Sequence, residues 1–437
     1  MSAQMRPSFV PKSSILKAFL SLLICGLCAC SAGEAKETQG AQETNETKTP
    51  SAPQAAYALE FRIQFEPGAK SALAEVRVSQ SVAAMRELDL NMPAAQYQVR
   101  SEQENIERQG DRVSWRVPEQ GGALAYTVHL PHLRGQAYDA YVDADWALLR
   151  FEDVFPAARV RTLRASTITN TRVIVDLPTD WNFASRYGDK AVIDLPDAGR
   201  RYQRPTGWLL AGDVATRREE IQGRRVAVGA PRQSGVRRLD ILSFLNWTLP
   251  EIVTLVPEFP ERLLIVSGGD PMWRGGLSAP GSLFVHAERP LVSENGTSTL
   301  IHELMHVGGL TSAAPGDDWI VEGLAEYYSI ELLRRSGGLS QKRFERTLQS
   351  LDAWAQADRG QLTDPSKGAD TAYAVLRFHA LAEALPSGGI DLVTRRLLVA
   401  DEISRSTLRE AVAQVSDEQL DFQAVIGPLA KPDKAQD

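Results

Sequence analysis

Two of the six histidines in the chain lie four residues apart, in the segment STLIHELMHVGGL (Ser298–Leu310). On a helix, residues i and i+4 share one face, so His302 and His306 can bind one ion at the ~2.0–2.1 Å of a zinc–nitrogen bond. Glu303 lies about 100° around such a helix from His302, where it can reach a water on the ion without being a ligand. This H-E-x-x-H pattern predicts a zinc hydrolase with Glu303 as general base. The alternative is a pair of capping or core histidines on an amphipathic helix.

The third ligand has two candidates. A zinc hydrolase uses three protein ligands and leaves the fourth position to water. The next helical segment, DDWIVEGLAEYYSIELL, carries Glu322 and Glu326, again at i and i+4. Glu322 lies inside the apolar stretch WIVEGLA, where a solvated acidic face is hard to arrange.

With these two segments the chain resembles the gluzincin metallopeptidases, in particular the branch of aminopeptidase N and the glycyl aminopeptidases. The resemblance implies that Glu322 is the third zinc ligand, that Tyr327 is the tyrosine following it, and that Glu326 orients a zinc-binding histidine. Fifteen residues separate His306 from Glu322, whereas the family has about eighteen, and spacing alone would favour Glu326. The resemblance covers the chain from about Leu239 onward, with its specific motifs in residues 297–328.

Two further regions follow from the resemblance alone. Tyr373, in DTAYAVLRFHALAEAL, matches a tyrosine that hydrogen-bonds the oxyanion, although a half-buried core tyrosine is the alternative. The segment GGLSAPGSLFV matches the edge strand of the substrate cleft, with Gly276, Leu277 and Ser278 as cleft residues. Ser278 stands where aminopeptidases carry the glutamate that grips the substrate's amine, and an uncharged serine cannot pair with an ammonium group. Cleavage at the amino terminus and cleavage within the chain therefore both stay open.

The elements that must position these residues fall into two regions with different hydrophobic periodicity. Residues 57–235 contain short runs of period-two alternation such as YALEFRIQF, which predict an antiparallel, sandwich-like β domain. From Leu239 a helical segment and the short strand RLLIVSG follow, and after Leu300 the pattern is helical. We expect helices over 319–336, 340–357, 370–385, 390–400 and 406–415.

The expected fold is therefore α+β and multidomain: a β domain (57–235), a thermolysin-like zinc-binding core (236–335) and a helical C-terminal part of the catalytic region (336–437). The other four histidines are expected to be ordinary residues. His129 and His132 lie in the β domain, with metal binding as the alternative. His286 is expected on the surface beside Glu288, with a cleft contact as the alternative, and His379 in a structural role.

The N-terminal region predicts export. All three cysteines lie within the first 30 residues, after basic residues and the apolar run AFLSLLICGLCAC, which is too short for an ordinary membrane span. LCAC resembles the lipobox of bacterial lipoproteins, which implies a signal peptide at 1–29 and a lipid on Cys30; a plain secretory signal is the alternative. Residues 30–56 are expected to be a flexible linker. Ser31 after the cysteine points to the cell envelope, at the outer membrane and facing the periplasm or the cell surface.

The composition limits the classes of partner that this chain can bind. The net charge of −7 argues against nucleic acid, which needs concentrated positive charge. We expect a zinc-dependent peptidase with one Zn²⁺, a peptide or protein substrate, and membrane attachment through Cys30. The alternatives are an inactive, lipid-anchored pseudopeptidase that binds a peptide or protein, and a zinc hydrolase of a non-peptide amide or ester.

Overall fold

The computed structural model describes residues 56–66, 68–101, 103–164, 169–196, 201–416 and 420–428. The predicted signal peptide, the predicted lipid anchor Cys30 and most of the predicted linker lie outside these residues.

Two sheets near the N-terminus share one core. In Tyr57–Phe65 every second side chain is buried, as its alternation predicts, and the cluster around Phe61, Trp115 and Tyr126 joins both sheets. Within these two sheets, the described strand pairs are antiparallel except for β1 (Tyr57–Phe65) with β12 (Thr169–Asp176), which are parallel. The first sheet has the order β14 (Val192–Asp194), β12 (Thr169–Asp176), β1 (Tyr57–Phe65), β2 (Ser71–Ser79), β7 (Gly121–His129) and β4 (Tyr97–Val99). The second has the order β11 (Ala158–Thr162), β3 (Met85–Asn91), β6 (Arg112–Arg116) and β5 (Ile106–Gln109).

A third, antiparallel sheet joins this β domain to the predicted catalytic region. Its order is β13 (Asn182–Ser185), β15 (Trp208–Gly212), β10 (Trp146–Arg150), β9 (Ala137–Val142) and β8 (His132–Arg134), with the one-turn helix α1 (Phe151–Val154) after β10. Successive strand residues point to opposite faces. Leu149 and Leu209 therefore enter the core of the β domain, whereas Leu148 and Leu210 pack against the next sheet.

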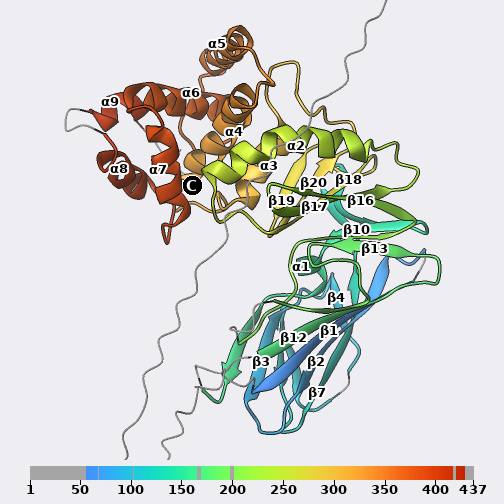
Figure 1. Ribbon diagram of the computed structural model, residues 1–437. Helices are drawn as coiled ribbons and strands as arrows, with labels where there is room; N and C mark the ends of the chain where they lie inside the picture. Colours follow the sequence, from blue (N-terminus) through green and yellow to red (C-terminus); the bar gives the residue numbers. More distant parts are fainter. Residues whose placement is uncertain are drawn as a thin grey trace, which may run out of the picture. The chain divides into compact units, whose positions relative to one another are not determined.

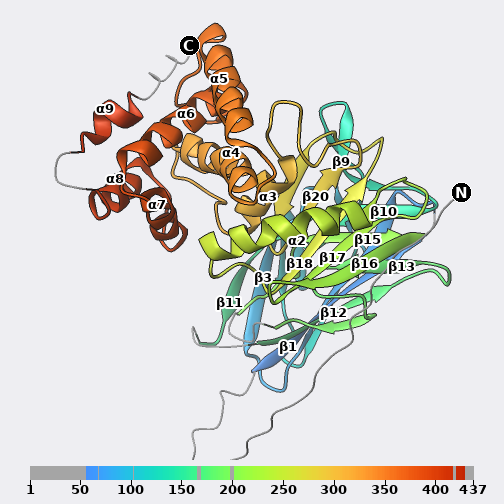
Figure 2. The same ribbon diagram turned by 45° about the horizontal axis from the view of Figure 1, so that its top comes forward.

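The fourth sheet belongs to the predicted catalytic region. Its order is β16 (Val214–Ile221), β17 (Arg224–Pro231), β18 (Arg262–Gly268), β20 (Ser282–His286) and β19 (Gly276–Ala279), parallel in the middle and antiparallel at both ends. Helix α2 (Arg238–Leu255) lies across β16–β18, as Figure 2 shows, and shares a core with Val226 and Ile265. Strand pairing thus places β16 and β17 in the catalytic sheet, although the predicted β domain extended to residue 235.

The helices follow the sheet in sequence and pack beside it. Helix α3 (Thr299–Val307) contacts β19 and β20 and packs against α4 (Asp318–Arg335), as Figure 1 shows. Their bounds are α3 (Thr299–Val307), α4 (Asp318–Arg335), α5 (Gln341–Ala357), α6 (Ala369–Ala384), α7 (Gly389–Leu398), α8 (Arg405–Ala413) and α9 (Phe422–Ile426). The predicted helices are confirmed to within two residues, and so is the predicted order of a β domain before a catalytic region with a helical end.

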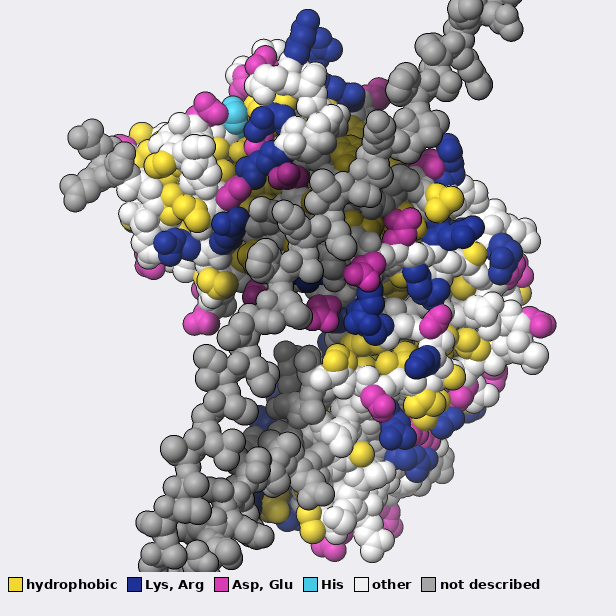
Figure 3. All heavy atoms as spheres, in the orientation of Figure 1, with side chains coloured by type: hydrophobic (Ala, Val, Ile, Leu, Met, Phe, Trp, Pro, Cys, Tyr) yellow, Lys and Arg dark blue, Asp and Glu magenta, His cyan; other side chains and the backbone are white. Residues whose placement is uncertain are grey.

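Two surface properties complete the description. Among the described residues, no helix combines the length and apolarity that crossing a membrane requires. On the face drawn in Figure 3, Lys and Arg side chains are interspersed with Asp and Glu side chains.

Candidate metal centre

Helix α3 presents the two histidines of the sequence motif. Ser298 caps the helix, its hydroxyl accepting the N–H of Ile301, as expected for a serine at this position. Leu300, Ile301 and Leu304 are fully buried and fix the rotation of the helix. The same rotation turns the face with His302 and His306 toward α4.

His302, His306 and Glu322 form a group of three potential ligands, the one such group found among the described residues. The two Nε2 atoms are 3.0 Å apart, and the Glu322 oxygens lie 3.4 Å from His302 Nε2 and 3.7 Å from His306 Nε2. Four ligands around zinc at ~2.0–2.1 Å would be separated by roughly 3.3 Å, so the spacing fits a tetrahedral ion.

The outer nitrogens of both rings are already engaged. Glu326 Oε2 lies 2.9 Å from Nδ1 of His302, and the carbonyl oxygen of Leu310 contacts Nδ1 of His306. Each ring therefore donates an Nδ1–H outward and turns an acceptor Nε2 inward. Two acceptor nitrogens and a carboxylate facing one another require a cation between them. Burial lowers the pKa of His302, but hydrogen bonds to Glu322 and Glu326 raise it well above its usual range.

Glu303 is held on the other side of the histidines, against strand β19. Its side chain is only 7 % exposed, and both the backbone N–H and the hydroxyl of Ser278 donate hydrogen bonds to it. Burial raises the pKa of Glu303 to about 7, although the positive charge of His302 and the bonds from Ser278 act in the opposite direction. A Cβ on Gly276 would come within 2.6 Å of Glu303 Cγ, so the close approach of strand and carboxylate requires glycine.

These residues line one cavity of about 970 Å³, here called the α3–α4 cavity. One wall is β19, which is the edge strand of its sheet. The cavity is lined by Arg134, Arg186, Pro260, Trp273, Gly276, Leu277, Ser278, Ala279, Pro280, Gly281, His302, Glu303, His306, Val307, Thr311, Asp318, Val321, Glu322, Ser366 and Lys367. The three predicted cleft residues of β19 are among them, together with two arginines from the third sheet and its loops that the sequence did not indicate.

Tyr373 is not among the residues that line this cavity. It lies on α6, where the guanidinium of Arg377 covers its ring and its hydroxyl faces Gly427 after α9. The role of Tyr373 as oxyanion donor therefore stays a prediction of the sequence resemblance. Tyr327 is buried and packs its ring against Tyr328.

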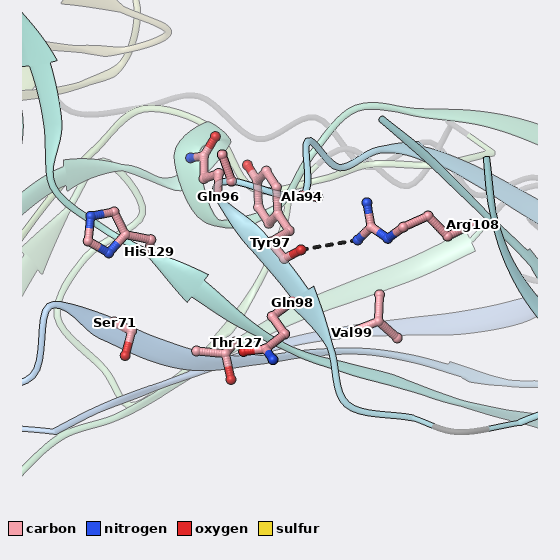
Figure 4. A pocket seen from close by; sticks show the side chains of 10 residues that line it. Ser71, Ala94, Gln96, Tyr97, Gln98, Val99, Arg108, Thr127 and His129 are labelled. Atoms are coloured by element: carbon pink, nitrogen blue, oxygen red, sulfur yellow. Dashed lines mark hydrogen bonds between the residues drawn. The ribbon is translucent and has the colours of Figure 1, made fainter. Parts of the chain in front are cut away.

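The remaining histidines lie elsewhere. His129 borders a separate pocket in the β domain, shown in Figure 4, in which the guanidinium of Arg108 donates to the carbonyl of Tyr97. His132 pairs with Asp139, and His379 packs against the ring of Phe344.

The expectation for His286 was wrong. This residue was assigned to the surface, but it is 1 % exposed at the end of β20, where its Nδ1 accepts the N–H of Glu288. Strand β20 lies between β18 and β19 in the sheet, and its side chains are buried up to the last residue, His286.

No protein-family model matches this chain, and no curated protein matches it either. Solved structures do match. An M1 zinc metallopeptidase from Deinococcus radiodurans is 16 % identical, with a TM-score of 0.58 over 88 % of this chain and 96 % of that one. A glutamate-to-alanine mutant of the M1 zinc metallopeptidase from that organism, bound to a Tyr-Ser-Ala substrate, is 15 % identical, with a TM-score of 0.57 over 86 % and 95 %. An aminopeptidase N family protein from Idiomarina loihiensis is 14 % identical, with a TM-score of 0.57 over 85 % and 71 %.

At these identities the likeness establishes the fold. The chain has the architecture of a two-domain M1 peptidase, with β sheets first and a helical catalytic region after them. Its cluster of His302, His306 and Glu322 matches the H-E-x-x-H…E ligand pattern of the gluzincins.

Proposed function

We propose that this chain is a zinc-dependent peptidase. The observation that carries the proposal is the inward convergence of two imidazole acceptors and one carboxylate, with a second, buried carboxylate held beside them. Zn²⁺ is the cation that best fits two imidazoles and a carboxylate in this arrangement.

His302, His306 and Glu322 would hold the ion, and Glu326 keeps the His302 ring in position. Bound zinc supplies Lewis acidity, which polarises a carbonyl group and makes a water a stronger nucleophile at neutral pH. Glu303 takes the proton from the attacking water and delivers it to the departing amine. Ser278 orients Glu303 for both transfers through its two hydrogen bonds.

An extended peptide can bind along β19. Among the described strands, β19 pairs only with β20, so no further strand is paired with its outer edge. A substrate that adds as a further strand would bring its backbone past Glu303, because Gly276 and Ser278 contact this carboxylate.

Cleavage should not require a free amino terminus. The cavity is lined by three carboxylates. Glu322 belongs to the ligand set, Glu303 accepts bonds from Ser278, and Asp318 accepts the N–H of Ser366. Because each has a partner, and because serine occupies position 278, the cavity presents no dedicated carboxylate to a substrate ammonium group.

The same proposal places the protein in the bacterial cell envelope, anchored through a lipid on Cys30 at the outer membrane. Its support is the sequence of the first 31 residues, with an apolar run ending in LCAC and Ser31 after the cysteine. Labelled palmitate should be incorporated into the wild-type chain and not into Cys30→Ala. Equal labelling of both would reject the anchor.

The test of the peptidase is digestion of a defined peptide library, with free and with acetylated amino termini, by the wild type and by Glu303→Gln. The account expects cleavage of both libraries by the wild type alone. Cleavage restricted to free amino termini would show that another group binds the amine. A wild type that holds one zinc and cuts no peptide would instead favour a binding protein or a non-peptide hydrolase.

A further inference from the structure

The walls of the α3–α4 cavity carry three cations, although the chain as a whole is acidic. They are Arg134, Arg186 and Lys367. In the part of the chain that the structure describes, none of the three forms an ion pair with a carboxylate. Of the acidic lining residues, Glu303 and Glu322 lie around the histidines. The third, Asp318, lies near Lys367 and accepts the N–H of Ser366.

Arg134 marks one end of strand β19. Its guanidinium lies 4.6 Å from the centroid of the Trp273 ring. That ring lies over Gly275, where a Cβ would meet it at 2.1 Å, and Gly275 immediately precedes β19. An exposed cation stacked on an aromatic ring is held in place and keeps its N–H groups available for an anion.

Arg186 marks the other end. Its Nε would lie 2.9 Å from a Cβ added to Gly281, which is in the turn that follows β19. One terminal nitrogen donates to the hydroxyl of Thr206, a neutral partner that leaves the charge uncompensated. The guanidinium also stacks over Tyr187, 5.0 Å from the ring centroid, so it is fixed in direction.

Lys367 lies on the α4 side of the cavity. The N–H of the preceding Ser366 is bonded to Asp318, which fixes this loop to the first turn of α4. The side chain of Lys367 is exposed. All the cationic lining positions are therefore at the ends and rim of the groove along β19, and Glu303 is at its middle, beside Gly276 and Ser278.

We propose that the cavity selects acidic peptides, with a carboxylate on each side of the cleaved bond. This inference rests on the proposed peptidase function. Four residues of β19 span about 13 Å at 3.3 Å per residue, so a strand bound along it would place side chains two or three residues from the reacting carbonyl beside Arg134 or Arg186. A guanidinium binds a carboxylate through two parallel hydrogen bonds and rejects an ammonium group at the same place.

The experiment uses pairs of acetylated, amidated decapeptides that differ by Glu against Gln at one position, two or three residues before or after the cleaved bond. The wild type should show kcat/KM about 10-fold higher for Glu than for Gln on both sides. The ratio should fall as salt rises, because partly exposed charges are screened. In Arg134→Gln the ratio should fall about 5- to 10-fold on one side only, and in Arg186→Gln on the other side.

The ratio is measured within each variant, so a partial loss of folded enzyme cancels. Arg346→Gln, an exposed arginine on α5 that does not line the cavity, is the matched control and should keep the wild-type ratio. Lys367→Gln tests the rim without touching the packed arginines and should lower the Glu preference as well. A wild-type ratio near one, or a ratio unchanged in all three cavity variants, would overturn the inference.

A binding measurement separates this inference from the proposed function. Glu303→Gln should bind the Glu decapeptides about 10-fold more tightly than the Gln ones, measured by fluorescence anisotropy without turnover. Cleavage with no preference for Glu leaves a peptidase and refutes the acidic substrate. Preferential binding without any cleavage by the zinc-loaded wild type supports the acidic ligand and refutes the peptidase. Equal binding of both peptides would contradict the inference whatever the activity.

Discussion

Gly276→Ala should inactivate the enzyme through the position of Glu303 while leaving the metal in place. A Cβ at this residue would lie 2.6 Å from Glu303 Cγ, 2.8 Å from Glu303 Oε1 and 2.8 Å from Thr299 Cγ2. Contacts of this kind normally begin near ~3.4 Å, so the carboxylate must move by roughly 1 Å. A misplacement of about 1 Å costs ~10²-fold in rate, and the full contribution of a general base is ~10²–10⁴-fold. We therefore expect kcat/KM to fall about 10²- to 10³-fold.

The assay is kcat/KM on a cleavable peptide together with zinc content by mass spectrometry. Zinc should remain near one per chain, because the atoms nearest to a Cβ on Gly276 belong to Glu303 and Thr299 and not to the three ligands. Extra volume in a packed site can cost about 1–3 kcal/mol of stability, so the melting temperature is recorded as well. Gly269→Ala is the matched control: no atom lies within 4 Å of its added Cβ, and its activity should be unchanged. If the folded, zinc-loaded Gly276→Ala keeps activity within threefold of the wild type, Glu303 is not the base, or β19 does not position it.

Three other variants test separate parts of the site. Glu303→Gln should retain zinc and lose about 10²–10⁴-fold in kcat, which parallel metal analysis and kinetics would show; full activity would exclude its role as base. Glu322→Ala should lose zinc at concentrations that saturate the wild type. Glu326→Ala should bind zinc about 10- to 100-fold more weakly in a competition titration, because this change affects only the orientation of His302. If Glu326→Ala lost zinc and Glu322→Ala only weakened its binding, Glu326 would be the ligand. Tyr373→Phe should keep kcat within about threefold, because its hydroxyl faces Gly427; a loss of 10²-fold or more would restore the oxyanion role that the sequence resemblance implies.

The helices and strands of this fold could be predicted where the local spacing of apolar residues shows which face is buried. The alternation in Tyr57–Phe65 and the helical spacing beyond Leu300 each record which face is buried, and the structure confirms both. The assignment of β16 and β17 to the catalytic sheet was not predictable. Their pattern indicates strands, but the identity of the partner, β18, depends on a register that no local pattern contains.

The residues of the site likewise include some that local sequence patterns predict and some that they do not. The sequence predicts His302, Glu303 and His306 because one helix carries all three, and it places Glu322 and Glu326 one turn apart on the next. The structure then brings these helices together.

What could not be predicted comes from contacts between distant segments. The hydrogen bonds of Ser278 to Glu303 join a strand to a helix, and Arg134 and Arg186 reach the cavity from the third sheet and its loops. The hydroxyl of Tyr373 lies beside Gly427, in a segment that has no recognisable motif of its own.

The central claim is that zinc held by His302, His306 and Glu322 supports peptide cleavage with Glu303 as base. The most direct measurement is the peptide-cleaving activity of the metal-free wild-type chain during stepwise addition of zinc, beside Glu303→Gln under the same conditions. The account predicts activity that rises with zinc to a maximum at one ion per chain in the wild type, and equal zinc binding with almost no activity in the variant. Activity that does not depend on zinc, or a variant as active as the wild type, would contradict it.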